Sequence, residues 1–174
     1  CYLDQKMIPK LRQIPGHILY LVLISLIGLV LMIWALIQFI GFQDKSAFLL
    51  FALLGALSQL AGTTATIKSK TGVTYAISPA VSLATVPFFG PAAAVLIESV
   101  TNLSLWLFKP VDEIKWKRSL PQLFFNAAMG NISIFAGGYV YQLITKTIES
   151  NVLLWAIIPW LLAAIFNDQF NLWI

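Results

Sequence analysis

The chain has 174 residues, of which 59% are hydrophobic and only 10% are charged. Soluble domains usually carry about 25% charged residues, so this composition excludes a water-soluble globular domain. The formal net charge of +4 resembles that of a nucleic-acid-binding protein, but the positions of the basic residues have a membrane explanation, and no nucleic-acid partner is expected.

Six apolar segments follow one another along the chain. A helix needs about 20 mostly apolar residues to cross a bilayer, and each segment meets or approaches this length. They cover residues 16–41, 46–62, 73–89, 91–108, 120–144 and 151–166. The third contains Pro79 and Pro87, so we expect it to be kinked, broken or partly re-entrant, and packed inside the bundle.

The basic residues fall on alternate connections between these segments. Nine of the 11 Lys and Arg residues lie before the first span or in the second-to-third and fourth-to-fifth connections, and only Lys45 and Lys146 lie on the other side. Because cytoplasmic loops are enriched in Lys and Arg, both termini are predicted to be cytoplasmic. The sequence therefore predicts an all-α integral membrane protein: a cytoplasmic segment of residues 1–15 and one six-helix transmembrane domain over residues 16–174.

Polar residues within the predicted spans are few. Glu98 is the only carboxylate inside a span, and Asn102 lies four residues later on the same helix face. Asn126 and Asn131 lie in the fifth span, so the four side chains could form a polar seam through the bundle. Such a seam serves as hydrogen-bonded contact between helices, as a ligand or ion site, or as a path for protons, and the sequence leaves these alternatives open.

Small residues form a second pattern. They recur within the second and fifth spans, where they let helix backbones approach closely. The candidate packing positions are Gly55, Gly62, Gly130, Gly137 and Gly138.

The chain offers little for metal or covalent chemistry. One Cys and one His exclude a disulfide or a Cys/His metal cluster within the chain. His17, at the start of the first span, is either an interfacial side chain or a ligand to a haem or pigment, so the cofactor remains unknown. No catalytic constellation or GxxxxGK[ST] motif is present, and we expect a protein that is not an enzyme.

One stretch resembles a known family. The residues that carry the resemblance are the Ser-Pro-Ala entry at Ser78, the FGP turn at Phe89–Pro91, the FNAA sequence at Phe125–Ala128, and Asn167 and Asn171 near the C-terminus. The run is similar to the N-terminal multi-helix membrane domain of bacterial signalling proteins that carry HD-GYP phosphodiesterase or GGDEF cyclase domains. The resemblance implies a sensor or anchor in the bacterial inner membrane, with an output domain after Ile174. No HD, GYP or GGDEF sequence is present in this chain.

Three functions remain in competition. The first is a non-enzymatic sensory or anchoring module that binds a small ligand in the polar seam and is connected to a cytoplasmic output domain or other membrane subunits. The second is the small-molecule-binding subunit of a transporter of the energy-coupling-factor kind. The third is an accessory subunit of an energy-converting or photosynthetic membrane complex. The ligand, the partners and the oligomeric state are not specified by the sequence.

Overall fold

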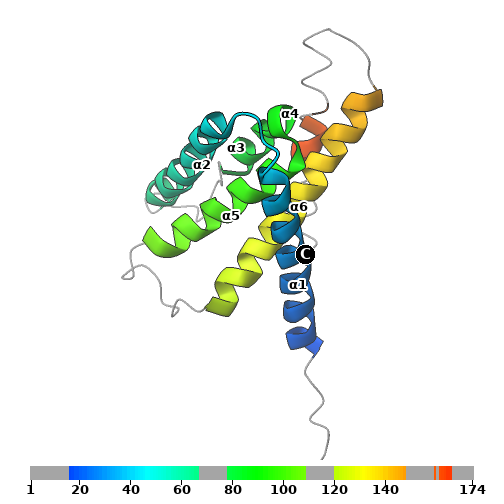
Figure 1. Ribbon diagram of the computed structural model, residues 1–174. Coiled ribbons are helices and arrows are strands. Elements are labelled where there is room, and N and C mark those ends of the chain that lie inside the picture. The colour runs from blue at the N-terminus through cyan, green and yellow to red at the C-terminus, as the bar shows by residue number, and fades with distance from the viewer. Residues whose placement is uncertain (1–15, 67–77, 109–119, 148–158, 160, 166–174) are drawn as a thin grey trace, which may run out of the picture.

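A computed structural model describes residues 16–66, 78–108, 120–147, 159 and 161–165. Figure 1 shows the helices, which are α1 (Gly16–Phe39), α2 (Lys45–Thr66), α3 (Ser78–Ala84), α4 (Val86–Phe89), α5 (Pro91–Phe108) and α6 (Leu120–Thr147). Within the described ranges all regular structure is helical, so the all-α prediction is confirmed there. The predicted N-terminal segment, the basic connections, most of the sixth span, and Asn167 and Asn171 lie outside the described residues.

The exposed surface of the helices is suited to lipid. α1, α5 and α6 are each long and apolar enough to cross a membrane, while α2 and the α3–α4 pair contribute shorter apolar stretches. α1 is the least buried of the three long helices, and its outward side chains include Leu19, Val30 and Ile37, each more than 60% exposed. Contiguous apolar surface of this kind is rare on soluble monomers and identifies a membrane protein.

α5 lies at the centre of the bundle and contacts α1, α2, α3, α4 and α6. Its first two turns, Pro91–Glu98, are buried throughout. Three of these residues are alanines, at positions 92–94, and their short side chains let the neighbouring helices approach. Gly55 of α2 makes a similar contact, because a Cβ at this position would lie 2.9 Å from Ile97 Cγ2 and 3.1 Å from Thr101 Oγ1 of α5.

The predicted third span is broken, in agreement with its prolines. α3 ends at Ala84, and α4 begins after Thr85 with Pro87 in its first turn, where a missing N–H does not interrupt the helix. The Ser82 carbonyl accepts hydrogen bonds from the Thr85 amide at 3.3 Å and the Thr85 hydroxyl at 2.6 Å. The backbone then turns at Gly90, whose φ of +80° favours glycine, and α5 starts at Pro91.

The connection between α1 and α2 ends with a helix cap. Asp44 Oδ1 accepts hydrogen bonds from the Ser46 hydroxyl at 2.6 Å and the Ala47 amide at 2.9 Å. An acidic N-cap of this kind satisfies a free amide in the first turn of the helix. The Ser46 hydroxyl, and after it the Ala47 amide, lower the pKa of the exposed Asp44 carboxyl.

α1 and α6 cross in close contact at Gly28. A Cβ atom at Gly28 would overlap both Cβ and Cα of Ala128. Gly28 and Ala128 are both buried, although the rest of α1 is mostly exposed. The two long helices therefore cross at one point where neither can carry a larger side chain.

Replacing Gly28 by Ala should therefore destabilise the protein. We expect Gly28→Ala to lower the free energy of unfolding by about 1–3 kcal/mol, because one methyl group must force α1 away from α6. Reversible unfolding in detergent measures this loss. Adding Ala128→Gly to the same chain should recover only a small part of the stability, since it removes the opposing methyl group but leaves the Cα of residue 128 against the new side chain.

Gly16→Ala is the matched control, because nothing lies within 4 Å of a Cβ at Gly16. Equal effects of Gly28→Ala and Gly16→Ala would contradict the crossing.

Candidate functional site

The most polar part of the bundle interior surrounds Glu98. This side chain projects from the buried half of α5 and is only 8% exposed. Its Oε2 accepts a hydrogen bond of 3.0 Å from the Ser82 hydroxyl of α3, and its Oε1 accepts one of 3.1 Å from Asn102 Nδ2. Asn102 Nδ2 also donates to the Glu98 carbonyl at 3.0 Å. Each carboxyl oxygen of Glu98 thus accepts a hydrogen bond from a protein side chain and needs no water molecule as a donor.

α6 covers this group with backbone rather than with a side chain. A Cβ at Gly130 would lie 3.0 Å from Glu98 Oε1, 3.1 Å from Glu98 Cγ and 3.2 Å from Asn102 Nδ2. A side chain at this position would press on the carboxyl group, which glycine leaves room for. The Glu98 cluster, defined as Ser82, Glu98, Asn102 and Gly130, therefore joins α3, α5 and α6.

A second polar contact lies beside this cluster. Ser99 Oγ lies 3.0 Å from both Asn131 Oδ1 of α6 and the Val95 carbonyl oxygen, and these two acceptors share its single hydroxyl proton. Asn131 is 2% exposed. A short polar strip thus runs along the α5–α6 contact, with Glu98 and Asn131 buried and Ser99 and Asn102 partly exposed.

The four residues of the predicted seam do not all meet. Glu98 and Asn102 are hydrogen-bonded to each other, and Asn131 lies next to them through Ser99. Asn126 is exposed on α6 and does not belong to the Glu98 cluster. Sequence reasoning missed Ser82, although a serine in a proline-broken apolar span was a usable signal.

The small residues occupy different positions in the bundle. A Cβ at Gly138 would lie 3.2 Å from both Pro91 Cβ and Val86 Cγ2, so this glycine faces the α4–α5 turn. Gly137 is buried beside it, and Gly62 lies in the last turns of α2, where side-chain surroundings are not described. Gly28 was absent from the predicted packing positions even though it marks the α1–α6 crossing.

His17 lies in the first turn of α1 and is exposed. Among the described residues, no group of three or more His, Cys, Asp or Glu side chains could hold a metal ion.

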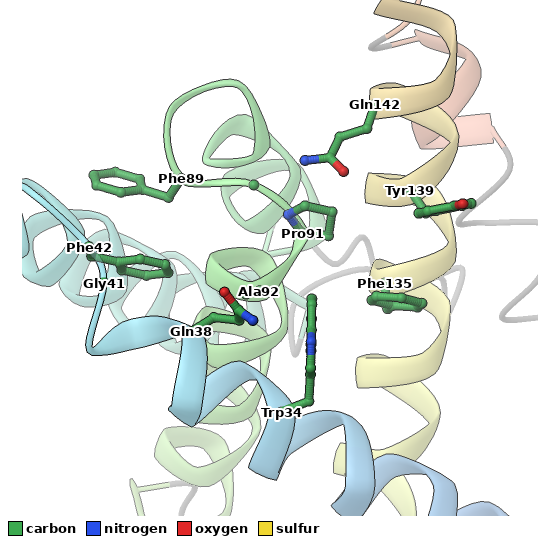
Figure 2. Close-up of a pocket in the computed structure, with 11 residues that line it drawn as sticks. Trp34, Gln38, Gly41, Phe42, Phe89, Pro91, Ala92, Phe135, Tyr139 and Gln142 are labelled. Atoms are coloured by element: carbon green, nitrogen blue, oxygen red, sulfur yellow. The ribbon is translucent and has the colours of Figure 1, made fainter. Parts of the chain in front are cut away.

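A cleft opens between the C-terminal part of α1, the α4–α5 turn and α6 (Figure 2). Its volume is about 410 Å³, within the common range of ligand pockets. Its lining is aromatic and amide-bearing, and consists of Trp34, Gln38, Gly41, Phe42, Phe89, Gly90, Pro91, Ala92, Phe135, Tyr139 and Gln142. No sequence pattern indicated this cleft, because its residues come from three distant segments.

Comparisons with protein-family models, curated protein sequences and solved structures give no match for this chain. The resemblance to membrane domains of signalling proteins therefore remains a prediction from its motifs.

The hydrogen bond from Ser82 can be tested by removing its hydroxyl. We expect Ser82→Ala to lower the free energy of unfolding by about 1–3 kcal/mol, because one buried oxygen of Glu98 loses its donor. Chemical unfolding in detergent measures the change. The matched control is Ser104→Ala, since within the described residues the Ser104 hydroxyl bonds only to the Val100 carbonyl of its own helix. A loss no larger than that of the control would show that the contact between Ser82 and Glu98 carries no stability.

Proposed function

We propose that this protein is a non-enzymatic sensory or anchoring module of the bacterial inner membrane. The observation that carries the proposal is the Glu98 cluster, a carboxyl group enclosed where three helices meet in an apolar bundle. Ionisable groups at such positions are costly and are usually kept for function. No catalytic residue is assigned, and the output is proposed to reach a cytoplasmic domain or another membrane subunit.

The cluster is suited to a sensory role because small movements disturb it. Glu98 is held on one side by a hydroxyl of the broken α3 and on the other by the backbone of α6 at Gly130. A shift of either element removes a hydrogen bond or opens the carboxyl group to water. The intact cluster is one packing of the helices, and the shifted, opened cluster is a second. A signal that favours one of them over the other would move α6 relative to α5.

The proposed topology has six spans with both termini in the cytoplasm. Two features support it: the uneven distribution of basic residues, and the helix directions in Figure 1, where α1 and α6 run one way and α2 and α5 run the other way. In this topology the α1–α2 connection and the α4–α5 turn lie at the outer side of the membrane.

Cysteine labelling tests the topology. In a Cys1→Ser background, Lys45→Cys and Lys146→Cys should react with an impermeant maleimide added to intact cells. Lys68→Cys and Lys115→Cys should react only after the membrane is opened. The reverse pattern, or labelling of all four from outside, would refute the proposed topology.

The sensory role can be tested with a fused output domain. We expect Glu98→Gln, in a chain followed by a diguanylate cyclase domain after Ile174, to change cyclic dinucleotide production about fivefold or more. The amide keeps the size of the side chain, but its NH₂ group replaces an oxygen that accepts a hydrogen bond.

The control for this fusion is Ser104→Ala, compared at equal membrane expression. Unchanged output from a folded Glu98→Gln fusion would leave only an anchoring role.

The cleft at the α4–α5 turn favours a second candidate, the ligand-binding subunit of a transporter. In that case a small molecule captured from the outer side would be passed to a partner membrane subunit. Co-purification with a transport partner, together with an unresponsive cyclase fusion, would favour this alternative. An accessory role in an energy-converting or photosynthetic complex is the third proposal, and a visible absorption band of the purified protein would support it.

A further inference from the structure

We infer that the cleft between α1, the α4–α5 turn and α6 binds an uncharged, planar ring compound with hydrogen-bond donors and acceptors along one edge. This inference deepens the proposed function by giving the ligand a place and a chemical class. Only the effect of the ligand on the output rests on the proposed function. Binding of the ligand in the cleft does not depend on it.

The aromatic side chains of the cleft are held in place before any ligand enters. Trp34 packs edge-to-face on Phe135, with ring centroids 5.4 Å apart and planes at 84°. On the opposite wall, the Phe42 and Phe89 rings lie 5.5 Å apart at 38°. Rigid aromatic walls of this kind favour flat ring systems, because stacking then costs little side-chain entropy.

Two glutamines provide the polar groups. Gln38 comes from the end of α1 and Gln142 from α6, and Figure 2 shows the Gln142 amide extending toward the turn before Pro91. Within the described part of the chain, no hydrogen bond occupies either side-chain amide. Each amide offers both a donor group and an acceptor oxygen, so together they fit a ligand edge that carries both.

Gly90 makes room for one of these amides. A Cβ at Gly90 would lie 3.3 Å from Gln142 Nε2, and the φ of +80° would strain any other residue. The turn that starts α5 therefore also leaves the Gln142 amide free at the cleft.

The lining also limits the charge of the ligand. None of the side chains that line this cleft in the described structure is charged. A charged group placed at the edge of an apolar bundle needs a partner of opposite charge, and the cleft supplies none. The volume of about 410 Å³ suits a compound of about two or three fused rings.

The probe for this site is lumichrome, an uncharged three-ring compound with donors and acceptors on one edge. The full chain in lipid nanodiscs should quench its fluorescence saturably, at one molecule per chain. Empty nanodiscs define the partition background. Gln142→Leu and Gln38→Leu should each weaken binding about tenfold, because each removes a hydrogen bond from the ligand edge.

Gly41→Phe should abolish binding by filling the mouth of the cleft. A Cβ at Gly41 meets only the Gln38 carbonyl, at 3.5 Å, so the fold should accept this residue. Gln59→Leu and Gly16→Phe repeat the same two chemical changes outside the cleft and should bind like the parent chain.

The absence of saturable binding, or equal binding by all variants, would overturn the inference. Binding that is lost in Gly41→Phe while the cyclase fusion ignores Glu98→Gln would keep the site and refute the sensory proposal. A fusion that responds to Glu98→Gln, together with no lumichrome binding, would refute the binding site and keep the sensory proposal.

Discussion

The structure depends most on the need to satisfy the Glu98 carboxyl group inside an apolar bundle. An unpaired carboxyl group in such surroundings costs several kcal/mol, so its partners must be supplied by the chain. Ser82 and Asn102 supply them, and Gly130 lets the α6 backbone lie close to the carboxyl group. This one requirement places the broken α3, the central α5 and the long α6 in fixed relation to each other.

Small residues then determine how the remaining helices assemble. The alanines at the start of α5, Gly55 of α2 and Gly28 of α1 replace side-chain bulk by backbone contact. In a bilayer, where lipid is as apolar as leucine, such close packing and hydrogen bonding hold helices together. The break at Thr85 and the turn at Gly90 have a further consequence, because they let α5 start beside the cleft lined by Gln38 and Gln142. The same loop geometry thus positions the buried cluster and the open cleft.

Sequence reasoning predicted the helices well and the site incompletely. Long apolar runs and prolines are local signals, so the helices that became α1, α5 and α6 and the break in the third segment could be predicted. Glu98 and Asn102 share a helix face and were correctly paired by their spacing. Ser82 could not be paired with Glu98, because the contact depends on how α3 packs against α5. Asn126 looked equivalent to Asn131, but five residues on a helix turn a side chain to a different face, and only the packing of α6 decides which one is buried.

The most direct test of the account is solid-state NMR of the unmodified chain in lipid bilayers, with ¹³C-labelled Glu, Ser and Gly. The account predicts through-space correlations from the Glu98 side-chain carboxyl carbon to Ser82 Cβ and to Gly130 Cα. It also predicts weak magnetisation transfer from water to Glu98, since the side chain is enclosed. Strong transfer from water or lipid to this carboxyl group, without correlations to Ser82 and Gly130, would contradict the central position of Glu98 in the bundle.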